Sequence, residues 1–261
     1  MESGPRWQVG SLSPVRLTVL GSNGTYPTVG KPASGYLLAA GGHQILLDCG
    51  PGVFAALHER GIVPDVIVLS HGHGDHCTDV VSLLNYLRFD RSEYRGIPLL
   101  APRGVVDRLA SFVGAGPDHL FFDVFAPDLV MPGSVIRFGE VALSFAEAVH
   151  PVPAVCVRVA VGGASLTYSG DTGPGGGLAQ LATGSDLILC EATHQGVPTP
   201  DRYPYHLYAS EAGAIATTSE VGALLVTHIA PTLDPEVSVT EAALEFEGPV
   251  AHAAPGMEVD L

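Results

Sequence analysis

Four side chains that can bind metal ions lie within the six residues 71–76, whose sequence is HGHGDH. Imidazole nitrogens and carboxylate oxygens are ligands for zinc, iron or manganese. The two glycines let the backbone turn tightly, so that the four side chains can converge. An apolar run over residues 66–69 ends just before them, and so many polar groups beside a buried strand are costly without a ligand. The motif therefore predicts a metal site, with ligands from among His71, His73, Asp75 and His76.

Four other apolar runs end at or just before a polar side chain that a core strand would not normally carry. These residues are Asp48 after run 44–47, Asp171 after 166–169, Glu191 after 187–190 and His228 after 224–227. Layered sheets build their sites from strand ends, because the strands are rigid and the following loops are free to carry function. We therefore expect these residues to lie near the HGHGDH loop.

The elements that must position these residues are many short strands with helices between some of them. Alternating or continuous apolar runs predict strands at 15–20, 36–40, 44–47, 66–69, 98–101, 135–138, 141–145, 155–161, 165–168, 187–189 and 223–226. Apolar spacings of three and four predict helices at 53–60, 78–88, 105–112, 178–183, 210–219 and 239–246. This order predicts a sheet-rich, layered fold rather than strict alternation of strand and helix.

Two stretches appear irregular. Residues 114–133 are rich in proline and glycine but carry Phe121, Phe122 and Phe125, which suits an ordered loop, a lid or a subunit contact. Residues 195–205 contain three prolines and two tyrosines in one connection. Because this second stretch leads directly to His206, we expect it to overhang the site.

Composition limits the classes of partner. The chain has 261 residues, 27 acidic and 12 basic, for a formal net charge of −15, and 46% of its residues are hydrophobic. The basic residues are scattered, whereas a protein that binds long nucleic acid clusters them to neutralise phosphates. We therefore expect one domain over residues 1–261 and no affinity for long nucleic acid.

The motif H-x-H-x-D-H after a strand resembles the signature of the metallo-β-lactamase superfamily. His150 in VHPVP, Asp171 in YSGDT and His228 in LVTHIAP are similar to the remaining ligand motifs of that family, in the same order. The resemblance covers nearly the whole chain. It implies an α+β fold, a four-layer αββα sandwich, with two metal ions at one edge of the sheets.

The resemblance also divides the ligands between the two ions. Asp171 would bridge them, and Asp48 would orient a ligand histidine through a hydrogen bond. One ion would be bound by His71, His73 and His150, and the other by Asp75, His76 and His228. The ions would be divalent, with Zn²⁺ the first expectation and Mn²⁺ or Fe²⁺ as alternatives.

Further motifs indicate a branch of the superfamily. Residues 19–24 (VLGSNG), 33–38 (ASGYLL), 189–193 (LCEAT) and 206–212 (HLYASEA) resemble the ribonuclease Z-like group, which implies a phosphodiesterase. Only 21 positions separate His150 from Asp171, which leaves no room for the long basic arm with which ribonuclease Z clasps tRNA. The chain is more similar to compact bacterial cyclic-nucleotide phosphodiesterases.

This interpretation gives each residue a role. Two divalent ions would lower the pKa of a bound water and hold a phosphate oxygen. Asp75 would accept a hydrogen bond from the attacking oxygen, His206 would protonate the leaving alkoxide, and Glu191 would hold the His206 ring in place. No pattern identifies residues that contact the substrate.

Several alternatives remain open from the sequence. The same centre could hydrolyse a lactone or another ester, process the 3′ end of tRNA as an endoribonuclease, or hold metal as a binding module without catalysis. We expect a cytoplasmic protein, because its four cysteines are dispersed and no long apolar segment suits a signal peptide or a membrane span. A homodimer through residues 114–133 is a further expectation.

Overall fold

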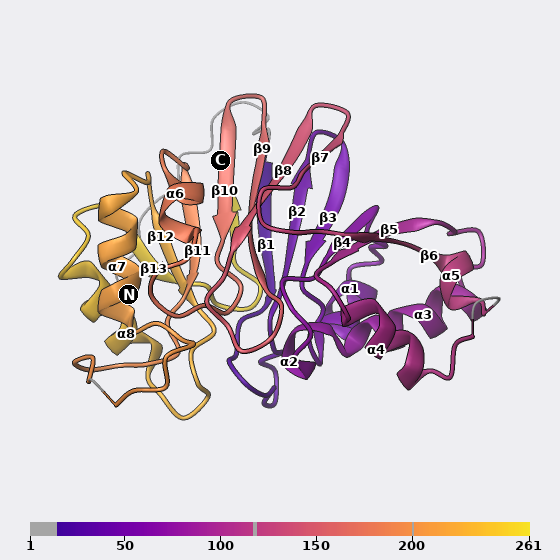
Figure 1. The fold of residues 1–261 in the computed structure, drawn as a ribbon, viewed down its shortest axis with the longest axis horizontal. Coiled ribbons are helices and arrows are strands. Elements are labelled where there is room, and N and C mark those ends of the chain that lie inside the picture. Colours follow the sequence, from indigo (N-terminus) through magenta and orange to yellow (C-terminus); the bar gives the residue numbers. More distant parts are fainter. Residues whose placement is uncertain (1–14, 117–118, 200) are drawn as a thin grey trace.

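Two seven-stranded β-sheets pack face to face, and helices cover both outer faces (Figure 1). The computed structural model describes residues 15–116, 119–199 and 201–261. This arrangement confirms the predicted α+β, four-layer sandwich. Its central layer is apolar and includes Tyr36 and Tyr168, whose rings are tilted against each other and buried at 0% and 2% exposure.

The first sheet has the strand order β14-β1-β2-β3-β4-β5-β6. Strands β3 to β6 run parallel to one another, so their carboxyl ends meet at one edge of the sheet. The strands are β1 (Val15–Gly21), β2 (Gly35–Ala40), β3 (His43–Leu47), β4 (Val66–Val68), β5 (Ile97–Ala101), β6 (Phe125–Leu129) and β14 (Glu258–Asp260).

The second sheet has the order β13-β12-β11-β10-β9-β8-β7. Strands β10 to β13 are parallel, and β8 points the same way because it is antiparallel to β9, as β9 is to β10. The strands are β7 (Val135–Phe138), β8 (Val141–Glu147), β9 (Val155–Val161), β10 (Ala164–Tyr168), β11 (Leu187–Glu191), β12 (Leu224–Thr227) and β13 (Val250–His252).

Each sheet has its own layer of helices, with a separate apolar core beneath it. The first sheet is covered by α1 (Val53–Glu59), α2 (Gly74–Cys77), α3 (Asp79–Phe89), α4 (Val105–Phe112) and α5 (Phe121–Val124). The second is covered by α6 (Leu178–Ala182), α7 (Ala209–Thr218) and α8 (Pro235–Ala243). In the described part of the chain, no helix is long and apolar enough to cross a membrane.

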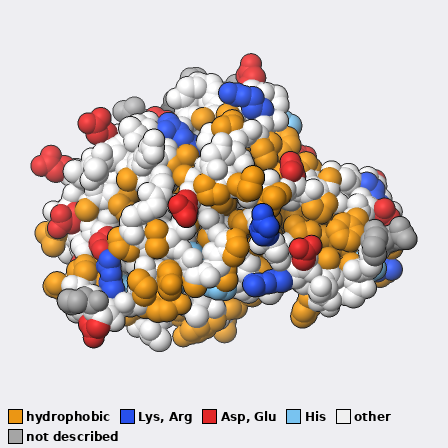
Figure 2. Space-filling model, viewed as in Figure 1, with side chains coloured by type: hydrophobic (Ala, Val, Ile, Leu, Met, Phe, Trp, Pro, Cys, Tyr) orange, Lys and Arg blue, Asp and Glu red, His pale blue; other side chains and the backbone are white. Residues whose placement is uncertain are grey.

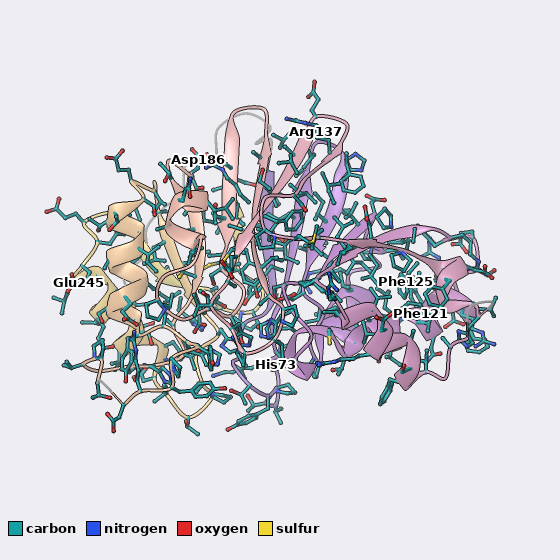
Figure 3. The ribbon with its side chains drawn as sticks, in the orientation of Figure 1. His73, Phe121, Phe125, Arg137, Asp186 and Glu245 are labelled. Carbon is teal, nitrogen blue, oxygen red and sulfur yellow. The ribbon has the colours of Figure 1, made fainter. Side chains whose placement is uncertain are left out.

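The prediction that residues 114–133 are irregular was wrong. Apart from residues 117–118, which lie outside the described residues, this stretch contains helix α5 and the edge strand β6. Phe121 and Phe125 are fully buried in the core under α5, and Phe122 is 38% exposed (Figure 3). Two of the three phenylalanines are therefore core residues, which removes them as the basis for a lid or a subunit contact.

Other differences concern element ends. Helix α8 begins at Pro235 rather than at residue 239, because Asp234 caps it by accepting a hydrogen bond from the Glu236 backbone amide. The short strands β13 and β14 and the four-residue helix α2 were not predicted. Residues 195–205 contain neither helix nor strand where they are described, as predicted.

Candidate metal centre

The seven predicted metal ligands meet at the sheet edge where the parallel strands end, and His73 lies at this lower edge in Figure 3. Within each of two groups, one ligand atom from every residue lies within 4.8 Å of the others. Asp171 belongs to both groups, as expected for a bridging ligand. The first group is His71, His73, His150 and Asp171, and the second is Asp75, His76, Asp171 and His228.

In the first group, three imidazole nitrogens point at one another. The Nδ1 atom of His73 lies 3.1 Å from Nε2 of His71 and 3.0 Å from Nε2 of His150. The Oδ2 atom of Asp171 lies 3.7 Å from the same Nε2 of His71. This donor set, three imidazoles and one carboxylate, suits a divalent transition metal.

The second group surrounds the other oxygen of Asp171. Its Oδ1 atom lies 3.1 Å from Nε2 of His76 and 3.4 Å from Nε2 of His228, while Asp75 Oδ2 lies 3.3 Å from that last nitrogen. Asp171 Oδ1 and His76 Nε2 are buried, and apart from their contact with each other neither has a hydrogen-bond partner among the described residues. Buried polar atoms are rarely left in this way, so the pair fits a bound cation.

The outward nitrogens of two ligand histidines, His76 and His71, are held by protein acceptors. His76 Nδ1 donates to Asp48 Oδ2 at 2.7 Å. The Ser70 hydroxyl donates to the same carboxylate, so it accepts from His71 Nδ1, which is 3.0 Å away. With Nδ1 held in this way, each ring directs Nε2 at the centre as the atom that can bind a metal.

The charge states of the ligand histidines differ between the two groups. Burial, followed by the charges of neighbouring histidines, lowers the pKa of His71 well below its ordinary value and outweighs the attraction of Asp171. Burial likewise lowers the pKa of His150, to about 4. Burial would raise the pKa of Asp171, but the positive charges of His228 and His76 lower it well below its ordinary value. Burial would lower the pKa of His76, but the charges and hydrogen bonds of Asp171 and Asp48 raise it well above its ordinary value. The neutral His71 and His150 are therefore ready to bind a cation, whereas His76 must release a proton when a metal ion binds.

Asp48 lies directly behind the second group and is fully buried. Its Oδ1 accepts from the Ser70 backbone amide, and its Oδ2 accepts from His76, from the Ser70 hydroxyl and from the Tyr168 hydroxyl, all at 2.7 Å. The backbone at Asp48 has a φ of 58°, in the left-handed region that only a well-supported turn holds. Asp48 thus makes the hydrogen bond to a ligand histidine that the resemblance implied.

We expect Asp48→Asn to weaken metal binding by about 10- to 100-fold, because the amide loses the negative charge facing His76 and fits three donors poorly at one oxygen. Competition with a metal indicator measures the affinity. Asp65→Asn is the matched control, since Asp65 is exposed and its carboxylate accepts only from the Gln44 amide at the opposite end of β3. Equal affinities for the two variants would contradict the role of Asp48.

Glu191 and His206 form a pair beside the two groups. Glu191 is fully buried, and its Oε1 lies 3.0 Å from Nδ1 of His206. His206 Nδ1 is 4.0 Å from Asp171 Oδ2. Burial alone would lower the pKa of His206, but the hydrogen bond and the charge of Glu191 outweigh burial and raise the pKa to about 9. His206 is therefore protonated at neutral pH, with Nδ1 bonded to Glu191 and Nε2–H free to donate.

Thr193 is a site residue that the sequence analysis missed. Its hydroxyl donates to Glu191 Oε2 at 2.7 Å and accepts from Nδ1 of His228 at 2.8 Å. It thus sets the tautomer of His228 and joins the pair to the metal ligands. Its position two residues after Glu191 was the available signal, and the motif LCEAT contained it.

The connection before His206 packs against the centre. The Tyr205 carbonyl accepts from His150 Nδ1 at 3.3 Å, and the Tyr203 ring lies 5.9 Å from the His206 ring. A Cβ atom at Gly173 would lie 1.8 Å from the Pro204 carbonyl, so only glycine permits this approach to the loop that carries Asp171. The metal-ligand groups among the described residues do not include His43, His58, His119, His194 or His252.

The sequence is similar to that of a known protein family and of several known proteins. Residues 43–229 match the family described as the beta-lactamase superfamily domain. An uncharacterized protein of Mycobacterium leprae is 38% identical over 97% of this chain and 90% of its own length. A ribonuclease Z of Mycolicibacterium paratuberculosis is 28% identical over 90% of this chain and 94% of its own.

Solved structures agree with the family model. The metallo-β-lactamase fold protein YhfI from Bacillus subtilis, 25% identical, superposes with a TM-score of 0.81 over 95% of this chain and all of the other. The short form of human tRNase Z, 19% identical, shares the fold, with a TM-score of 0.76 over 94% of this chain and 98% of the other. Family, fold and motifs agree, so the chain belongs to the metallo-β-lactamase superfamily of hydrolases, with ribonuclease Z among its relatives.

Proposed function

We propose that the protein is a phosphodiesterase with a binuclear metal centre, acting on a small phosphodiester such as a 3′,5′-cyclic nucleotide. The observation that carries the proposal is Asp171, whose two oxygens face two separate groups of ligands beside the Glu191–His206 pair. Two divalent ions, with Zn²⁺ our first choice, would supply Lewis acidity for the phosphate and lower the pKa of water.

The residues of the chain supply the proton chemistry. Asp75 Oδ2 accepts from the Thr25 amide at 3.0 Å and is only partly buried, so it can also accept a hydrogen bond from an attacking oxygen. His206 can donate the Nε2 proton to the leaving alkoxide, and Glu191 stabilises the imidazolium and fixes the ring. An acid on the leaving side is needed for a cyclic nucleotide, because the ribose alkoxide is a poor leaving group.

Two further observations support this substrate class. Relatives named ribonuclease Z act on RNA, a phosphodiester, and a structural relative is named a diphosphatase of the PhnP family. The net charge of −15 opposes a long polyanion on the surface and favours a small substrate. RNA cleavage is the second candidate function, because a ribonuclease Z aligns over 90% of this chain.

The test is metal analysis followed by a substrate panel on the same preparation. We expect two Zn²⁺ per chain and turnover of 3′,5′-cyclic AMP and bis(p-nitrophenyl) phosphate that exceeds cleavage of precursor tRNA. Hydrolysis of an acyl-homoserine lactone without either phosphodiester would contradict the proposal. A fully metal-loaded protein that turns over none of the four substrates would instead be a binding module.

A further inference from the structure

A cavity of about 440 Å³ opens next to the metal centre and shares one wall with it. The shared wall is His150, a candidate metal ligand, so the cavity adjoins the centre. The volume falls within the range of small-molecule sites. The cavity is therefore placed to hold the part of a substrate that does not react.

Most of the residues that line the cavity are apolar. They include Pro102, Val130, Met131, Pro132, Val152 and Pro153. Met131 is 52% exposed, so its side chain is accessible to a ligand in the cavity. Prolines and a methionine give flat or adaptable contact surfaces, which suit the faces of an aromatic ring.

Two opposite charges line the same cavity, namely Arg103 and Glu147. Among the residues that the structure describes, neither side chain forms a hydrogen bond or an ion pair, with each other or with a third group. Most other arginines of this acidic protein are engaged, as Arg91 is with Glu93 and Arg202 with Glu211. On the face in Figure 2, basic and hydrophobic side chains both lie beside the exposed histidine atoms at the lower edge.

Apolar walls with a free guanidinium and a free carboxylate match a nucleobase better than a phosphate or a sugar. The faces of a base are apolar, whereas its edges carry donors and acceptors. Guanine presents two adjacent acceptors, O6 and N7, to which a guanidinium bonds in bidentate fashion, and its N1 and N2 hydrogens suit a carboxylate. Adenine presents a donor, N6, beside its N7, and so satisfies an arginine only in part.

We propose that this cavity is the base subsite of the enzyme, in which Arg103 and Glu147 select guanine over adenine. The inference rests on the proposed function, since it assigns the base of a cyclic nucleotide whose phosphate lies at the metal centre. Arg103 is then a specificity-determining residue that touches the substrate but takes no part in the chemical step.

The experiment compares three substrates with the zinc-loaded full-length protein: 3′,5′-cyclic GMP, 3′,5′-cyclic AMP and ribose 3′,5′-cyclic phosphate, which has no base. We expect the wild type to have a KM about tenfold lower for cyclic GMP than for cyclic AMP, within the range of one bidentate base contact. Arg103→Met keeps the apolar stem and should raise the KM for cyclic GMP about tenfold at unchanged kcat. The variant should leave the KM for the base-free substrate unchanged.

Arg137→Met is the matched control. Arg137 is another arginine without a hydrogen-bond or ion-pair partner among the described residues, and Figure 3 shows it at the end of the molecule opposite His73. It should change no KM. Glu147→Gln should raise the KM for cyclic GMP without raising that for the base-free substrate.

Three results would overturn the inference. Equal KM values of the wild type for all three substrates would show that the base is not bound, while leaving the phosphodiesterase proposal intact. An equal effect of Arg103→Met on all three would mean that Arg103 only attracts the phosphate charge. If the wild type hydrolyses none of them, the proposed function fails and the base subsite falls with it.

Discussion

Asp171→Ala should reduce bound metal from two ions per chain to one or fewer and lower kcat/KM for any phosphodiester by at least about 10³-fold. Among the described residues, Asp171 alone belongs to both four-residue groups of ligands, so its loss affects both ions at once. A metal centre supplies several kcal/mol of transition-state stabilisation, and about 4 kcal/mol corresponds to three powers of ten in rate.

Elemental analysis after dialysis measures the metal, and circular dichroism verifies that the variant is folded. Asp186→Ala serves as the control, because Asp186 accepts from the Ser165 amide at the far end of the second sheet (Figure 3) and is remote from the centre. It should keep both ions and full activity. Two tightly held ions in Asp171→Ala would show that the carboxylate does not bridge.

The residues of the metal centre could be predicted because they interrupt apolar patterns. A buried strand tolerates a terminal His71 or His228 only where a ligand compensates for the polar group, and the HGHGDH motif concentrates four such residues. Parallel strands then bring these polar residues to one edge of the sheets. The positions of Asp48, Asp171 and Glu191 at the ends of predicted strands were therefore enough to expect a cluster.

The residues that hold these ligands in place were not predictable in the same way. Thr193 reaches His228 across 35 positions, and Tyr168 reaches Asp48 across 120. A threonine or tyrosine near a strand is ordinary, and only the packing of the two sheets brings these hydroxyls to the carboxylates. The tautomer of each ligand histidine therefore depends on tertiary contacts that carry no local pattern.

The errors in the predicted strands and helices have local causes. Strand β6 was missed because Pro127 and Asp128 break its apolar pattern, and both are tolerated only because β6 is an edge strand. Strands β13 and β14 are three residues long, too short for a period to show. The start of α8 could have been predicted, since Asp234 followed by Pro235 is a typical helix beginning.

His206→Ala should lower kcat on 3′,5′-cyclic AMP by about 10²- to 10⁴-fold, the usual contribution of a general acid, while both metal ions remain bound. His206 belongs to neither four-residue group, and its Nδ1 is held by Glu191 at 3.0 Å, so the variant loses a proton donor and no ligand of either group. His58→Ala, on the exposed side of α1, is the control and should retain full activity.

Two readouts separate an acid from a structural residue. The loss should be much smaller for bis(p-nitrophenyl) phosphate, because p-nitrophenolate leaves without protonation whereas a ribose alkoxide does not. The wild type should also lose activity at alkaline pH, as the imidazolium that Glu191 stabilises gives up its proton, and the variant should lack that decline. Equal losses on both substrates, or loss of metal from His206→Ala, would mean that His206 has a structural role at the centre rather than that of an acid. A loss confined to the poor leaving group places the His206 proton on the departing oxygen.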